Sequence, residues 1–173
     1  MKLPQFATIV FLLSFSFHSV GQATIKCNEN KFEDPFLENI IGSWDATGKI
    51  GTDPVAYHFT GNWELNHQFI LLSFADTARQ PQYIARVYIG VDCVSERYVV
   101  HWLDNFGGRF SETLGYGTRS GDSIPFRFEY PDGPFINTFT YDNSLDSWQF
   151  HSETKNSKGI WEPFGDIYLK RVK

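Results

Sequence analysis

The sequence predicts an all-β protein, an up-and-down antiparallel β-barrel of about ten strands with one short N-terminal helix closing an end. After residue 44, short apolar runs alternate with stretches rich in Gly, Asn, Asp and Pro, as strands and turns do. No second helical pattern follows the first. A sheet of this size would expose two edges if it stayed open, and closure into a barrel removes them. A two-sheet sandwich is the alternative.

The first residues are typical of a signal peptide. Lys2 precedes an apolar run over 6–17, and small residues follow at Ser19, Gly21 and Ala23. The run is shorter than the roughly 20 residues that span a bilayer, so an uncleaved anchor is the less favoured alternative. We therefore expect a secreted or periplasmic protein divided into a signal peptide (1–23), an N-terminal extension (24–33) and a barrel domain (34–173).

The charge balance argues against two classes of partner. The formal net charge is −5, and it becomes −6 when Lys2 leaves with the signal peptide. Basic residues cluster only at the extreme C-terminus, in 170–173. Nucleic acid and anionic membrane surfaces are therefore poor candidate partners, and no membrane insertion is expected after signal removal. Aromatic residues make up 17% of the chain, which is more than a solvated scaffold needs.

Residues 34–41 predict a helix of about two turns. Asp34 can cap it with its carboxylate, Pro35 suits the first helical position, and Gly42 suits a left-handed stop. Its apolar stripe has no second helix to pack on, so we expect the helix to plug one end of the barrel. The residues of the stripe are Phe36, Leu37, Ile40 and Ile41.

The strand over 55–65 shows the clearest period of two. Its apolar face holds Val55, Tyr57, Phe59, Gly61, Trp63 and Leu65. The first expected strand, which begins near Trp44, precedes it. The strands expected after it are 68–74, 83–91, 97–104, 109–116, 123–130, 135–141, 147–153 and 160–172. A barrel of this strand number is wide enough to enclose a cavity.

The two cysteines, Cys27 and Cys93, are a candidate disulfide pair, since an exported protein meets oxidising conditions. Two unrelated thiols are the alternative. The sequence contains no CxxC motif and no Cys/His cluster that would suggest a metal site.

Several short motifs carry a family resemblance. A short helix followed by Gly42-Ser43-Trp44, an uninterrupted meander and a basic residue near the end of the last strand resemble the calycin group, which includes lipocalins and fatty-acid-binding proteins. The runs 88–92 and 100–104 and the ending 168–173 look like the uncharacterised DUF1579 family of exported bacterial proteins. The calycin resemblance implies that Trp44 closes the bottom of the barrel. It also implies that Arg171 packs across the ring and hydrogen-bonds the entry helix.

We expect the barrel to bind a small, largely apolar or amphipathic molecule. The expected aromatic lining is Tyr57, Phe59, Trp63, Trp102, Phe110 and Phe139, and the candidate polar anchors are Arg86, Glu112 and Asn137. Asp104 continues the face of Trp102. The facing of Glu112 stays open, because Gly107-Gly108 permits a bulge that would turn Glu112 to solvent and Ser111, Thr113 and Gly115 inward.

Three other functions remain alternatives. Interdigitating aromatics would fill the barrel, which would then act as a surface interaction module. By analogy with other calycins, a buried carboxylate beside an open cavity would suit an isomerase or cyclase. Haem binding, as in nitrobindin-like calycins, needs a histidine near the C-terminal strands, and His151 is the sole stand-in. No nucleophile motif is present, so we assign no catalytic residue, cofactor or metal.

Overall fold

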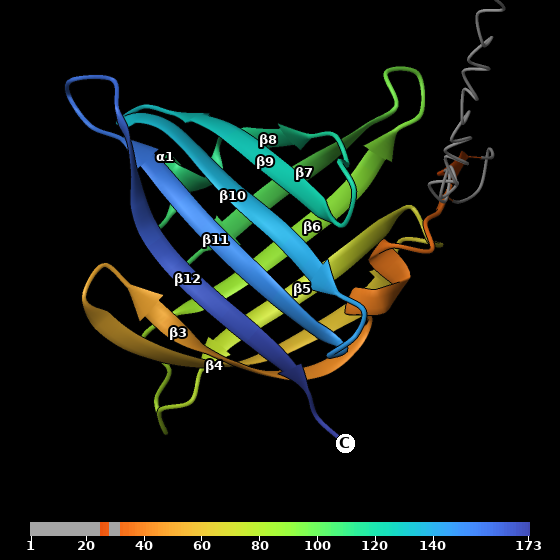
Figure 1. Ribbon diagram of the computed structural model, residues 1–173, viewed down its shortest axis with the longest axis horizontal. Coiled ribbons are helices and arrows are strands. Elements are labelled where there is room, and N and C mark those ends of the chain that lie inside the picture. The colour runs from red at the N-terminus through yellow and green to blue at the C-terminus, as the bar shows by residue number, and fades with distance from the viewer. Residues whose placement is uncertain (1–24, 28–31) are drawn as a thin grey trace, which may run out of the picture.

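The chain forms a closed antiparallel barrel in the computed structural model, which describes residues 25–27 and 32–173 (Figure 1). Ten strands follow one another around the ring in the order β10-β11-β12-β3-β4-β5-β6-β7-β8-β9. Pairing of β12 with β3, for example of Leu169 with Ala46, joins the last strand to the first and closes the ring. The predicted ten-stranded barrel is therefore confirmed, and the two-sheet alternative is wrong. The predicted signal peptide lies outside the described residues.

The bounds of the elements differ little from the predicted ones, apart from one region discussed below. They are β1 (Lys26–Cys27), β2 (Phe32–Glu33), η1 (Leu37–Ile40), β3 (Gly42–Ile50), β4 (Asp53–Glu64), β5 (Phe69–Asp76), β6 (Ile84–Asp92), β7 (Arg97–Asp104), α1 (Gly108–Ser111), β8 (Leu114–Gly117), β9 (Ser123–Tyr130), β10 (Gly133–Asp142), β11 (Ser147–Lys155) and β12 (Trp161–Arg171). No helix among the described residues has the length and apolar character needed to cross a membrane.

Aromatic side chains fill the middle of the barrel. Alternate residues of each strand point inward, and the rings of Phe139 and Phe150 stack with their centroids 3.8 Å apart. Phe59 packs edge-on against Phe74 at 4.7 Å and against Phe150 at 5.9 Å. These four rings form a packed layer, here called the aromatic layer, that separates the two ends of the barrel.

The short helix η1 covers one end of the barrel, at the right in Figure 1, as predicted for a plug. It is one turn of 3-10 helix rather than two turns of α-helix. The Asp34 carboxylate does not cap it, because Oδ1 accepts from the Phe36 amide two residues on and Oδ2 accepts from the Tyr98 hydroxyl. Leu37 and Ile40 are fully buried, so the short turn still acts as the plug.

A glycine lets the plug lie directly on the sheet. A Cβ atom built on Gly61 of β4 would come within 2.4 Å of the backbone oxygen of Ile40, a distance that real Cβ atoms do not reach. The backbone of η1 therefore packs against the backbone of β4 only because residue 61 has no side chain.

Trp44 and Arg171 occupy the positions that the family resemblance implied. The Trp44 indole donates to the backbone oxygen of Ile40 at 2.9 Å, beneath the plug. The guanidinium carbon of Arg171 lies 4.1 Å from the centre of the Trp44 ring. Arg171 also donates to the backbone oxygens of Asn39 and Ile41, at 2.8 Å each. The last strand is thereby tied to the first strand and to the plug.

A disulfide joins Cys27 to Cys93, across a sequence separation of 66 residues. Cys27 belongs to β1, which pairs with β2 in a separate two-stranded ladder. Phe32 of β2 is buried, and its amide donates to the backbone oxygen of His67. The described part of the N-terminal extension is therefore fastened to the barrel near the β6–β7 turn.

The predicted strand over 109–116 is wrong in its first half. The chain turns at Gly107, whose φ is +96°, and forms the short helix α1 before it pairs again as β8. Gly115 and Gly117 of β8 face inward, whereas Leu114 and Tyr116 are exposed. A pair of glycines before the segment permits this irregular path, which an alternation of residue types cannot predict.

Candidate ligand-binding cavity

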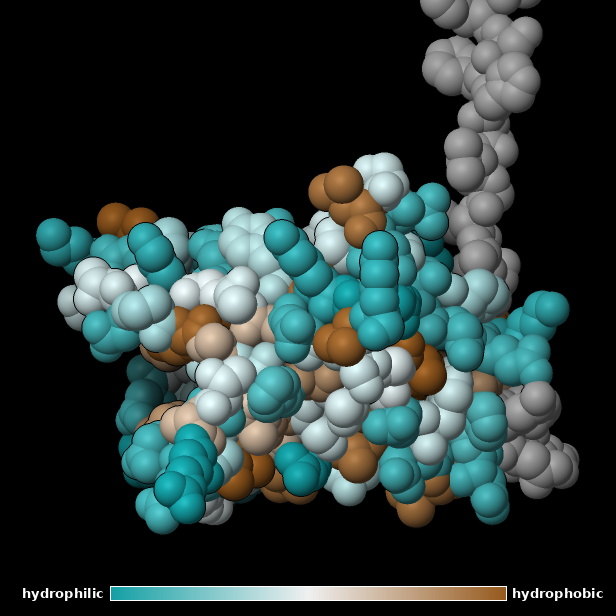
Figure 2. Space-filling model, turned by 90° about the horizontal axis from the view of Figure 1, so that it is seen from below, coloured by the Kyte–Doolittle hydropathy of each residue, from teal (hydrophilic) through white to brown (hydrophobic). Residues whose placement is uncertain are grey.

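The barrel encloses a cavity of about 610 Å³ on the side of the aromatic layer away from the plug. This volume is typical of small-molecule sites in proteins. The residues that line it are Ile50, Asp53, Val55, Tyr57, Phe74, Tyr83, Trp102, Asp104, Phe106, Phe110, Phe128, Tyr130, Asp132, Gly133, Phe135, Asn137, Phe150, Ser152, Thr154, Phe164 and Ile167. Figure 2 shows the molecule hollowed at its left end, away from the grey N-terminal atoms.

Aromatic rings make up the larger part of the lining. Phe74 and Phe150 of the aromatic layer form the floor, and their rings stand 6.2 Å apart. On one wall, Phe128 and Tyr130 stack with centroids 5.1 Å apart, and Phe135 packs edge-on against both. The interior is therefore a rigid apolar surface onto which flat or aliphatic groups can pack.

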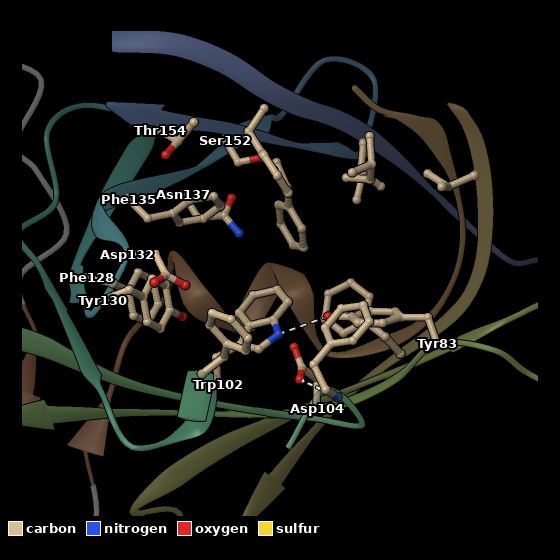
Figure 3. Close-up of a pocket in the computed structure, with 18 of the residues that line it drawn as sticks. Tyr83, Trp102, Asp104, Phe128, Tyr130, Asp132, Phe135, Asn137, Ser152 and Thr154 are labelled. Carbon is tan, nitrogen blue, oxygen red and sulfur yellow. Dashed lines mark hydrogen bonds between the residues drawn. The ribbon is translucent and has the colours of Figure 1, made fainter. Parts of the chain in front are cut away.

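A polar cluster interrupts the aromatic wall where β6 and β7 meet. The Trp102 indole donates to the Tyr83 hydroxyl at 3.0 Å (Figure 3). Beside them, one Asp104 oxygen accepts from the Phe106 amide at 3.0 Å. Burial raises the pKa of the Asp104 carboxyl above its usual range. Burial also raises the pKa of the Tyr83 hydroxyl, so this tyrosine stays neutral and keeps its proton for hydrogen bonding.

A second polar group lies on the wall formed by β10 and β11. The Asn137 side chain is 8% exposed, and its Oδ1 atom has no hydrogen-bond partner among the described residues. Neighbouring Ser152 donates to the backbone oxygen of Gly165 at 3.2 Å. Figure 3 places the Asn137 amide at the edge of the cavity. Rotation of the amide exchanges its oxygen and nitrogen, so it can offer the cavity either an acceptor or a donor.

Two further carboxylates stand at the cavity's rim. Asp132 forms an ion pair with Arg109 of α1, with 2.6 Å between the charged atoms. Asp53 is exposed at the start of β4. The mouth of the cavity is thus acidic, and one of its two rim charges is already compensated.

Four of the nine predicted ligand-binding residues line the cavity: Tyr57, Trp102, Phe110 and Asn137. The others lie elsewhere. Phe59 and Phe139 belong to the aromatic layer beneath the floor. Trp63 lies at the plug end, where its indole donates to Glu38 and its ring packs against Phe32.

Two predicted polar anchors point away from the cavity. Arg86 is exposed because β6 turns Ala85, Val87 and Ile89 inward, so the face assigned to this strand was wrong by one residue. Glu112 is exposed because it follows α1 and precedes β8, where no strand alternation holds it inward. The solvent-facing alternative for Glu112 is therefore the one that the structure shows.

Several cavity residues were not predicted from the sequence. Asp132 lies in a turn and carried no strand pattern. Tyr83 began the predicted strand over 83–91, but on the face that was not assigned to the cavity. Tyr130 did carry a signal, because it continues the inward alternation of Phe126 and Phe128 on β9. Asp104 ends the inward face of β7, as the sequence predicted from its position on the face of Trp102.

The histidine weighed for haem lies on the outer surface of the barrel. His151 pairs with Asp166 at 2.8 Å, while its neighbours Phe150 and Ser152 point into the barrel. Within residues 25–27 and 32–173, no group of three or more His, Cys, Asp or Glu side chains is arranged to hold a metal ion.

Comparison with proteins of known structure supports the fold. The crystal structure of Rv2717c from M. tuberculosis matches with a TM-score of 0.57 and 16% sequence identity, over 81% of this chain and 99% of that one. At this identity the likeness shows the barrel fold alone. Neither a family model nor a curated protein sequence matches the chain.

Proposed function

We propose that this protein binds a small, largely apolar molecule inside its barrel, as a lipocalin-like carrier. One observation carries the proposal: a cavity of about 610 Å³ lies on a floor and walls of aromatic rings, with few polar groups among them. Most ligand sites combine an apolar lining with a small number of placed polar groups in this way.

The cavity also favours a carrier over a filled barrel. In a filled barrel the aromatic rings at this end would all be covered by side chains from the opposite strands. Here Tyr83, Trp102 and Phe135 line the cavity and are only partly buried. A ligand in the cavity would remove apolar surface from water. Each Å² of apolar surface buried in this way contributes about 25 cal/mol in favour of binding.

We further propose that the protein acts outside the cytoplasm. The Cys27–Cys93 disulfide supports this location, because such bonds persist mainly in oxidising compartments. The signal-peptide pattern of the sequence points the same way. Detection of the protein in periplasmic or culture fractions, with residues 1–23 absent by mass spectrometry, would test it.

The binding proposal is tested with N-phenyl-1-naphthylamine, a neutral apolar dye that fluoresces strongly when it leaves water. Saturable fluorescence enhancement with one dye bound per chain by native mass spectrometry is the expected result. Ser152→Phe places a ring in the cavity and should abolish the enhancement. Glu153→Phe adds the same ring to the outer face of β11 and should leave it unchanged. Equal signals from both variants would contradict binding inside the barrel.

A further inference from the structure

The charged groups of the cavity are all of one sign. Among the described residues that line it, Asp53, Asp104 and Asp132 are acidic, and none is Lys, Arg or His. Burying a carboxylate near other carboxylates is costly, because like charges in a poorly solvated site repel one another. An anionic ligand, such as a fatty acid, would therefore meet repulsion, and the cation at the rim, Arg109, is already paired with Asp132.

The three carboxylates differ in how far their charge is already compensated by ion pairs or by solvent. Asp132 is already paired with Arg109, and Asp53 is exposed to solvent at the rim. Asp104 is half-buried, and it takes part in none of the ion pairs found among the described residues. Its compensating contacts are hydrogen bonds from the Phe106 amide and the Tyr83 hydroxyl, both of which are neutral donors. Asp104 is therefore the carboxylate that a bound cation would relieve most.

The surroundings of Asp104 also suit an ammonium group. An ammonium carries three N–H donors and no acceptor. Near Asp104 it would meet the Tyr83 hydroxyl oxygen and the ring of Trp102, which attracts cations (Figure 3). Partial burial of the carboxylate makes the charge pair stronger than it would be on the surface, because water screens it less.

Asn137 adds an independent sign that the cavity is built for a polar ligand group. More than nine-tenths of its side chain is buried, yet its Oδ1 atom has no partner among the described residues. Buried polar atoms without a partner are rare and costly. Rotation of the amide would turn this oxygen into the cavity, where a second hydrogen-bonding group of the ligand can donate to it.

We infer that the cavity selects amphipathic molecules whose polar end is a cationic amine, held by the Asp104 carboxylate, with the apolar part on the aromatic floor. This inference rests on the proposed function and narrows it to one class of ligand. It excludes fatty acids and other anionic lipids as preferred ligands.

The test compares three probes that share one tail: dodecylamine, dodecanol and dodecanoate. Each is titrated at pH 7, below its micelle concentration, against protein loaded with N-phenyl-1-naphthylamine. Dodecylamine should displace the dye at a concentration at least about ten-fold lower than dodecanoate, since a charge-assisted contact contributes more than a ten-fold change in affinity. Equal or tighter binding of dodecanoate would overturn the inference while the carrier proposal stands.

Variants then identify the carboxylate. Asp104→Asn should weaken dodecylamine binding by about ten-fold and leave dodecanol within about two-fold. Glu64→Gln removes the same charge from an exposed position at the far end of β4 and should change neither. If Asp104→Asn still binds dodecylamine in preference to dodecanoate as strongly as the natural protein does, the inference is overturned. If Asp104→Asn fails to fold, the three-probe series on the natural protein decides the inference. If neither the dye nor any probe binds, the proposed function fails as well.

Discussion

The guanidinium of Arg171 lies 4.1 Å above the ring of Trp44, and the two residues face each other across the pairing of β12 with β3. They stand at opposite ends of the barrel domain in sequence. Arg171 also reaches the carbonyls of Asn39 and Ile41 and pairs with Asp146 at 2.6 Å. One side chain thereby joins the first strand, the last strand, the plug and the β10–β11 turn.

Arg171→Leu should lower the free energy of unfolding by about 2 to 3 kcal/mol, because hydrogen bonds from a charged donor and a cation–π contact are lost together. Urea denaturation followed by far-ultraviolet circular dichroism measures this. Lys170→Leu changes the neighbouring residue, which is exposed, and should alter stability by no more than about 0.5 kcal/mol. Equal losses in the two variants would contradict the role given to Arg171.

Asp104→Asn should stabilise the ligand-free protein at neutral pH. Burial raises the pKa of this carboxyl in the folded state, so folding favours its protonated form. Its charge therefore destabilises the fold once the pH exceeds both pKa values, and the penalty fades as the pH falls below the unfolded value. The gain from Asp104→Asn should be absent at about pH 3 and grow as the pH rises toward neutral. Thermal unfolding over this range checks it, and a pH-independent difference would contradict it.

Asn137→Leu should raise the free energy of unfolding by about 1 to 2 kcal/mol, because it removes a buried acceptor without a partner at little change in volume. Asn62→Leu is the matched control on the exposed face of β4 and should change stability by no more than about 0.5 kcal/mol. Chemical denaturation measures both. A destabilised Asn137→Leu would indicate that the amide is satisfied within the protein.

Reduction of the Cys27–Cys93 bond should lower stability without opening the barrel. On the chain-entropy model, a loop of this length contributes up to about 4 kcal/mol by restricting the unfolded chain. Both cysteines are exposed, so a mild reductant should reach the disulfide. Chemical denaturation with and without reductant gives the difference, and circular dichroism should keep its β-sheet signature. An unchanged midpoint would mean that the bond contributes nothing to stability.

The sequence predicted the barrel well where the pattern was local and regular. The strands at Arg97–Asp104 and Ser123–Tyr130 have the predicted bounds, since alternation and flanking turn residues define them. The plug was placed correctly by the apolar stripe around Leu37 and Ile40. Its length was not, because the Asp34 carboxylate bonds to the chain two residues on and to Tyr98, a residue far away in sequence.

The cavity was harder to predict because it depends on which face of each strand points inward. A shift of one residue moves every side chain of a strand to the other face, and this misplaced Arg86. The Gly107-Gly108 pair let the chain leave the sheet, which put Glu112 in solvent. Residues in turns, such as Asp132, reach the cavity through tertiary packing alone.

The central claim is that a ligand enters the barrel and contacts its aromatic wall. Trp102 lines the cavity, whereas Trp161 lies on the outside of β12 beside Lys155. Titration of ¹⁵N-labelled protein with N-phenyl-1-naphthylamine, followed through the indole N–H signals, therefore gives the most direct measurement. The Trp102 signal should move saturably while that of Trp161 stays in place. Movement of Trp161 alone, or of neither signal, would contradict binding in the cavity.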